Sequence, residues 1–191
     1  VYTEGITGIT EADVAYAAAC GGVIKLIGRV TRTEDGHLFC LVAPMILPRE
    51  HLLAGVDDVY NGIMVRGDSV GDVVFVGRGA GKLPTASAVV ADVIDALKDG
   101  SKIHDSLFWK PAEKLDHQLM DTAKYSYYIR TAGVPAAALP NVAGPGKLVF
   151  DYGDSAAYLI EAATAADLEA VAAKLEVLGG RLALVLKKLP E

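Results

Sequence analysis

The chain has 191 residues, of which 52% are hydrophobic and 22% charged, and its formal net charge is −6. This apolar content suffices for a globular core, whereas the acid excess argues against nucleic-acid or anionic-membrane partners, which need clustered Lys and Arg. No apolar run reaches the roughly 20 residues of a membrane helix, and the N-terminus has no signal-peptide pattern, so we expect a cytoplasmic protein.

The first hundred residues show the pattern of an antiparallel sheet with helices. Thr10 and the acidic residues after it predict the start of a helix over 11–20, which glycines end. The β-rich runs predict one hairpin over 23–30 and 37–43 and a second over 59–66 and 72–76, with Pro44 and Pro48 bracketing the connection between them. A long helix with an apolar stripe is predicted over 84–98, beginning at Pro84, and it is expected to cover the sheet.

A second, smaller unit is predicted after a polar linker at 101–124, which is expected to contain one helical segment near 111–123. Its predicted elements are strands over 125–131, 148–151, 156–162 and 181–187 and a helix over 165–178. The Ala-, Pro- and Gly-rich segment 133–146 predicts an irregular loop. The predicted fold is therefore α+β, with a mostly antiparallel sheet in 1–100 followed by a small α+β unit in 125–191.

The most informative motif is the glycine-rich segment 77–86, which lies between a predicted strand and the long helix. Its three alternating glycines let backbone approach a ligand closely, and the start of the helix offers unpaired N–H groups to an anion. The segment does not fit a phosphate-binding P-loop, because Val76 and Leu83 stand where that motif needs Gly and Ser or Thr. Lys82 stands where a dinucleotide fingerprint needs its third Gly. A purely structural strand-to-helix turn therefore remains an alternative to a ligand-facing loop.

The string Gly-x-Gly-Ala-Gly-x-x-Pro-Thr-Ala over 77–86, followed by Ala88 to Asp92, resembles a signature of the homoserine dehydrogenase family. Further matches to that family occur in the same order along the chain, at 4–6, 9–10, Asp13, 16–17, 24–28, Val42, Pro44, 47–48, His51, 53–54, 56–61, 67–68 and 70–71. Together the matches span about residues 4 to 97.

The resemblance implies an NAD(P)-dependent oxidoreductase that interconverts aspartate semialdehyde and homoserine. This reaction is a branch-point step in the biosynthesis of threonine and methionine. It also implies that the family's nucleotide-binding domain, catalytic lysine and homoserine-holding carboxylates precede this region, so we expect the chain to be cut from something longer and assign it no catalytic residue. By resemblance Gly81 contacts the cofactor, with Gly79, Ala80 and Thr85 as neighbours. NAD(P) binding then needs the nucleotide-binding domain, on the same or a separate chain.

Other polar residues in the sequence receive structural interpretations. Lys25 shares a strand face with apolar residues, and we interpret it as a lysine whose stem packs while its ammonium reaches solvent. Cys20 and Cys40 are interpreted as buried small apolar residues, and neither they nor the four scattered histidines have the spacing of metal ligands. No metal site is expected.

By resemblance, the sheet of residues 23–76 is the element through which two subunits pair, which implies a homodimer. Ile63, Val65, Val73 and Phe75 would form one buried face, although an intramolecular helix layer explains them equally well.

The tail resembles an ACT domain in its opening strand, 127–130, but the turn and first helix of that module are replaced by 132–146. A structural tail, which only pads the fold or pairs with a neighbour, is an alternative to effector binding. For the whole chain two alternatives remain, a non-catalytic regulatory or assembly domain that senses an amino-acid effector through its tail, and a diverged protein that uses the glycine loop for another anion.

Overall fold

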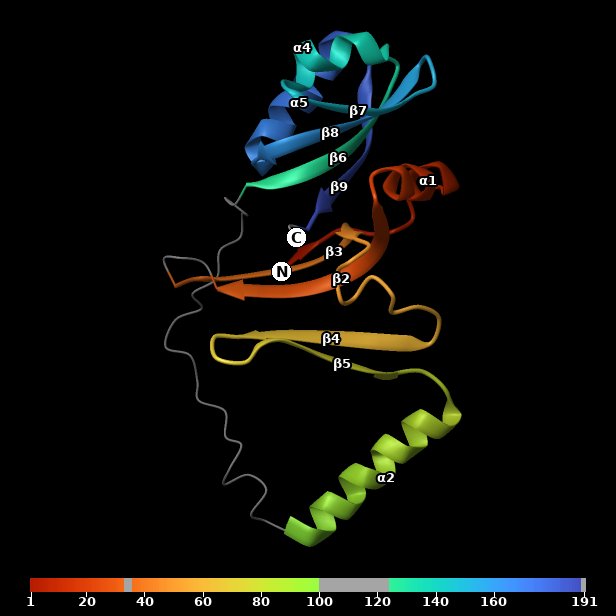
Figure 1. The fold of residues 1–191 in the computed structure, drawn as a ribbon, viewed down its shortest axis with the longest axis vertical. Coiled ribbons are helices and arrows are strands. Elements are labelled where there is room, and N and C mark those ends of the chain that lie inside the picture. The colour runs from red at the N-terminus through yellow and green to blue at the C-terminus, as the bar shows by residue number, and fades with distance from the viewer. Residues whose placement is uncertain (33–35, 100–123, 190–191) are drawn as a thin grey trace. The chain divides into compact units, whose positions relative to one another are not determined.

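The computed structural model describes residues 1–32, 36–99 and 124–189 and has the predicted α+β fold with a mostly antiparallel sheet (Figure 1). It divides into two compact units, Val1–Ala54 with Asp116–Glu191, and Gly55–Leu115. These units differ from the predicted boundaries at 1–100, 101–124 and 125–191, because residues before Gly55 share a hydrophobic core with the C-terminal part. The functional division of the chain stays a prediction. The linker prediction, with its helical segment near 111–123, lies outside the described residues except for residue 124.

The N-terminal part of the first unit contains a short strand, a helix and a long hairpin. These are β1 (Tyr2–Thr3), α1 (Glu11–Ala19), β2 (Gly22–Arg32) and β3 (Leu38–Pro48). The predicted helix and hairpin are confirmed.

The expectation that Pro44 and Pro48 bracket a connection is wrong, because both lie in β3. Pro44 pairs with Leu26 of β2. On the other edge of β3, the segment 41–42 pairs with β1 and the segment 45–46 pairs with β9 (Arg181–Lys188). Pro44 lies between these two paired segments. A missing N–H is least costly at such a gap between partner strands.

The C-terminal part of the first unit is a small α+β module. Its remaining elements are β6 (Tyr125–Ala132), the 3-10 turn η2 (Ala136–Ala138), α4 (Leu139–Ala143), β7 (Gly146–Asp151), β8 (Ser155–Ala163) and α5 (Ala165–Val177). The predicted strands and helix are confirmed, but the prediction of an irregular loop over 133–146 is wrong, since η2 and α4 occupy it. Alanines favour helix there, Pro140 sits in the first turn where no N–H is needed, and Gly144, with φ of 80°, ends the helix.

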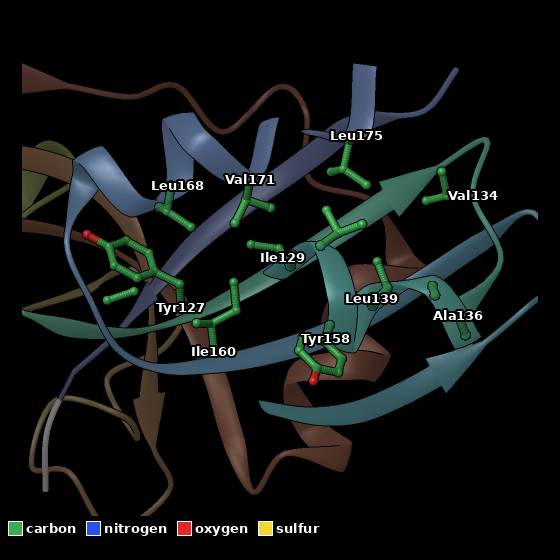
Figure 2. Packing of buried hydrophobic residues seen from close by; sticks show 13 residues of the cluster. Tyr127, Ile129, Val134, Ala136, Leu139, Tyr158, Ile160, Leu168, Val171 and Leu175 are labelled. Carbon is green, nitrogen blue, oxygen red and sulfur yellow. The ribbon is translucent and has the colours of Figure 1, made fainter. Parts of the chain in front are cut away.

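The strands of this module have the order β9-β6-β8-β7, which with two helices gives the βαββαβ arrangement of ferredoxin-like folds. Helices α4 and α5 cover one face of its sheet with a buried cluster that includes Ile129, Leu139 and Leu175 (Figure 2). Thr164 and Asp167 form a capping box at the start of α5. The module therefore has a core of its own on this face.

The second unit contains the hairpin of β4 (Tyr60–Gly67) and β5 (Gly71–Arg78) and the helix α2 (Lys82–Asp99). The hairpin confirms the predicted pairing, and its register places Ile63 opposite Phe75 and Val65 opposite Val73 on one face. That face is not buried as expected, since Ile63 is 64% and Phe75 63% exposed.

The helix α2 does not cover the hairpin face either. Its apolar stripe is exposed over its length, by 43 to 80%, at Val89, Val90, Val93, Ile94 and Leu97. A two-stranded sheet and one helix have too little apolar surface to form a core without a partner. No helix in the described ranges combines the length and the apolar character needed to cross a membrane.

Candidate functional site: the glycine turn before helix α2

The glycine motif forms the turn between β5 and α2. Gly81 is the N-cap of the helix, because its carbonyl accepts the first helical hydrogen bond, from the N–H of Thr85, at 3.1 Å. The φ of Gly81 is 121°, in the region that residues with a Cβ rarely adopt. The helix begins at Lys82, two residues before the predicted start at Pro84. Pro84 is instead its third residue, still within the turn that needs no N–H.

The start of α2 has several features that suit an anion. Gly81 has no side chain that could cap the helix, and the first turn carries no acidic residue. Lys82 and Leu83 are the first two helical residues, whose N–H groups have no partner within a helix. Pro84 has no N–H, so these two donors lie at the positive end of an 18-residue helix, where both residues are exposed. The turn therefore fits a negatively charged group such as a phosphate.

Gly79 lies beside a side chain of the adjacent strand. A Cβ built at Gly79 would overlap the side-chain amide of Asn61 in β4. Asn61 pairs with Gly77 in the hairpin register, so β4 holds the first half of the glycine motif. Sequence reasoning did not single out Asn61, although it lies at the end of a segment, 56–61, that carries part of the family resemblance.

Arg78 is a second residue that the sequence reasoning missed. Its guanidinium lies over the ring of Tyr60, 5.5 Å from the ring centroid. This cation–π contact restricts the Arg78 side chain to a position over the hairpin. Arg78 and Lys82 thus place two cations in or beside the turn that holds the predicted residues Gly79, Ala80, Gly81 and Thr85.

Lys25 and the two cysteines of the sequence analysis belong to the first unit. Lys25 is half-buried in β2, opposite Met45. Cys20 and Cys40 are both half-buried and not fully buried as expected, and burial raises the pKa of the Cys20 thiol. Across the described part of the chain, no three His, Cys, Asp or Glu side chains are grouped as a metal site would need.

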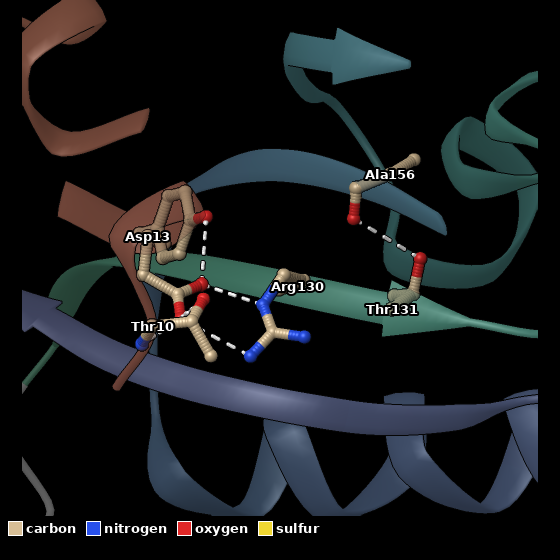
Figure 3. Close-up of polar contacts among 6 residues, drawn as sticks. Thr10, Asp13, Arg130, Thr131 and Ala156 are labelled. Atoms are coloured by element: carbon tan, nitrogen blue, oxygen red, sulfur yellow. Dashed lines mark hydrogen bonds and ion pairs between the residues drawn. The ribbon is translucent and has the colours of Figure 1, made fainter. Parts of the chain in front are cut away.

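A buried polar cluster in the first unit joins α1 to β6 (Figure 3). Asp13 is fully buried and accepts hydrogen bonds from the Nε of Arg130 at 2.5 Å, from its Nη2 at 3.1 Å and from the Tyr128 hydroxyl at 3.4 Å. It also accepts from the backbone N–H and the hydroxyl of Thr10, at 2.9 and 2.7 Å, which completes the cap of α1.

The charges in this cluster set the pKa values of its members. Burial alone would raise the pKa of Asp13, but the hydrogen bonds from Arg130 and Thr10 outweigh it and hold the pKa below the ordinary value. The hydrogen bond to Asp13 raises the pKa of Arg130. Burial, with the negative charge of Asp13, raises the pKa of Tyr128. Asp13 therefore stays ionised and Tyr128 protonated, and nothing in the arrangement suggests a proton donor for chemistry.

Comparison with known proteins connects these elements to one family. The family model described as homoserine dehydrogenase matches residues 1–94, which include α1, both hairpins and the glycine turn. A homoserine dehydrogenase of Pseudomonas aeruginosa is 41% identical over 135 residues, covering 68% of this chain and 31% of the relative. One from Synechocystis is 48% identical over 100 residues, covering 51% of this chain and 23% of the relative.

The fold comparison extends beyond the matched region. The crystal structure of a homoserine dehydrogenase from Thiobacillus denitrificans has a TM-score of 0.78 at 30% sequence identity, and the match covers 98% of this chain and 47% of that one. Through residues 1–94, the chain belongs to the homoserine dehydrogenase family. It spans between about a quarter and a half of the length of these relatives.

Proposed function

We propose that this chain is part of an NAD(P)-dependent homoserine dehydrogenase, which interconverts aspartate semialdehyde and homoserine on the route to threonine and methionine. Family membership through residues 1–94 supports the class of enzyme. The observation that carries the role of this chain is the glycine turn, with Gly81 at the N-cap of α2.

The role assigned to the turn is to contact the nicotinamide cofactor. When bound, the cofactor gives or accepts a hydride at the substrate carbon. The residues of this chain contribute binding only, with Gly81 as the principal contact and Gly79, Ala80 and Thr85 beside it. The exposed donors of Lys82 and Leu83, the Lys82 ammonium and the Arg78 guanidinium fit the phosphates of such a cofactor by their charge.

A nucleotide-binding domain, on the same or a separate chain, completes the enzyme in this proposal. The catalytic lysine and the carboxylates that hold homoserine are attributed to a further segment that also precedes the region matched here, so in this proposal the 191-residue chain alone is inactive. An assay of the isolated chain with homoserine and NAD(P)+ tests this directly. We expect no production of reduced cofactor, and robust turnover would refute it.

A chimera tests the activity itself. In the chimera this chain replaces the matching segment of the Pseudomonas aeruginosa enzyme, which keeps the rest of its own sequence. We expect oxidation of homoserine by the chimera and none by the P. aeruginosa enzyme from which the segment is deleted. A folded chimera that binds cofactor but does not turn over homoserine would count against the proposed function.

We also propose that the β4–β5 hairpin pairs with a second copy of the chain. Its face of Ile63, Val65, Val73 and Phe75 is apolar and largely exposed. Contiguous exposed apolar surface of this kind usually marks a protein interface. Sedimentation equilibrium of the chain in solution tests this proposal, and we expect the mass of a dimer.

The alternative function is a regulatory or assembly domain that binds an amino-acid effector through an ACT-like tail. The βαββαβ order of the tail favours it more than the sequence did, since η2 and α4 stand where the first helix seemed to be missing. Calorimetric titration with threonine distinguishes the two. Saturable heat at a defined stoichiometry would favour the alternative, and absence of heat would count against effector binding.

A further inference from the structure

The tail module does not stand apart from the N-terminal residues, because β3 extends its sheet. Met45 and Ile46 pair in parallel with Lys187 and Lys188 of β9. The N–H of Leu189 also donates to the carbonyl of Ile46 at 2.9 Å. One seven-stranded sheet therefore runs from β2 and β1 through β3 to the tail strands.

Helix α1 covers the face of the tail sheet that α4 and α5 leave open. Tyr16 and Ala17 of α1 are buried in one cluster with Tyr128 of β6 and Leu186 of β9. The ring of Tyr16 lies 4.7 Å from that of Phe150 in β7 and 6.0 Å from that of Tyr128. The tail is thus sandwiched between its own helices and a helix that belongs to the family-matched region.

Two polar contacts also connect residues 1–54 to the tail. Asp13 and Arg130 meet through two hydrogen bonds, with Asp13 fully buried and the Arg130 side chain only 18% exposed. Lys187, buried in β9, holds its ammonium 5.0 Å from the ring centroid of Tyr2 and 5.2 Å from that of Tyr125. These contacts tie β1 and α1 at one end of the sequence to β6 and β9 at the other.

We propose that residues 1–54 and the tail form one cooperative folding unit, with the Asp13–Arg130 pair as the latch between them. The tail is then a structural layer of the region before Gly55, rather than a regulatory module attached by a flexible joint. Any ligand or substitution that shifts β6 or β9 must shift α1 and the β2–β3 hairpin as well, because they share a sheet and a core. This holds whether or not the chain acts on homoserine.

Hydrogen exchange of the full 191-residue chain, measured by mass spectrometry in increasing urea, tests the proposal. Peptides from β2–β3 and from β6 and α5 report on the two sides of the junction. In the unmodified chain we expect both sets to lose protection at the same urea midpoint, as one foldon does. Separate midpoints would overturn the proposal.

The variant R130Q tests the latch. Removing one partner of a buried ion pair leaves the other uncompensated, so we expect the unfolding equilibrium constant to rise by roughly 100-fold or more, equally in both sets of peptides. R66Q is the matched control. Arg66 makes the same two-pronged contact with Asp72, at 2.6 and 2.8 Å, but its side chain is 71% exposed, and we expect little change.

A loss of protection in the tail peptides alone would contradict the latch. If R130Q does not fold, R130K carries the test, since it keeps the positive charge but cannot make the two-pronged contact. We then expect a smaller, still equal, shift in both sets. An R130K chain with unequal shifts would overturn the proposal.

Discussion

The side chain of Asn61 in β4 occupies the space that a Cβ on Gly79 would need. A larger residue at position 79 would therefore have to push the Asn61 amide aside. Sequence spacing alone does not reveal this contact.

We therefore expect G79A to be destabilising. The new methyl group would displace the Asn61 amide, which is the far end of an exposed side chain and can move aside, so we expect a loss of at most about 1 kcal/mol. Urea denaturation of the chain, followed by circular dichroism, measures the change. G77A is the matched control, because a Cβ at Gly77 would have no atom within 4 Å, and it should change the stability by less than about 0.5 kcal/mol. Equal effects of the two substitutions would show that Asn61 does not constrain the turn.

The core of the tail offers a second matched pair on one helix. Leu175 of α5 is fully buried, whereas Val177, two residues on, is 86% exposed. We expect L175A to lower the free energy of unfolding by about 2–5 kcal/mol, because it removes buried methyl groups and leaves a cavity. V177A should stay within about 0.5 kcal/mol of the unmodified chain. Thermal and urea unfolding check both, and a mild L175A would mean that α5 does not pack as described.

Acid should weaken the first unit through Asp13. Its pKa is held below the ordinary 3.8, so the carboxylate contributes stability that is complete above that value. This stability is lost as the pH falls through the lower, folded-state pKa. We expect the urea midpoint of the chain to drop as the pH falls from neutral to about 3.

The variant D13N isolates this effect. It should be less stable than the unmodified chain at neutral pH, and its stability should fall less on acidification. A D13N chain with the same pH profile as the unmodified one would place the acid sensitivity elsewhere.

The exposed face of the β4–β5 hairpin leads to a prediction about assembly. A charge at Phe75, in the middle of that face, would have to be desolvated in a dimer interface, so we expect F75E to weaken self-association by at least tenfold. Val70 lies in the turn of the hairpin and is 72% exposed, and V70E serves as the control. Sedimentation equilibrium measures both. A monomeric unmodified chain, or equal weakening by both variants, would contradict pairing through this face.

Much of the fold could be predicted because local chemistry determined it. The turn residues around Gly36 and Gly67 separated the hairpin strands, and the Thr10 cap started α1. Pro44 misled the prediction, because a proline is tolerated in β3 only where the partner strands leave a gap, and that gap depends on strands far away in the sequence. The same holds for Asp13, whose role in the cap was expected from its position but whose partner Arg130 lies 117 residues away.

The candidate site was predictable only in part, for a related reason. Alternating glycines before a helix indicate close backbone approach whatever the partner is, so Gly79 and Gly81 could be chosen from the sequence. Asn61 and Tyr60 come from the adjacent strand, and the hairpin register alone brings them to the turn. No periodicity in the sequence reports that register directly.

The role of Gly81 in cofactor binding is tested most directly by steady-state kinetics of the chimera with the Pseudomonas aeruginosa enzyme. An alanine at Gly81 would be strained, since its φ of 121° suits only glycine, at a cost of about 1–3 kcal/mol. We expect G81A to raise the KM for NADP+ or NAD+ by roughly tenfold and to leave the KM for homoserine within about twofold. A folded G81A chimera with an unchanged KM for the cofactor would contradict the assignment of this turn to cofactor binding.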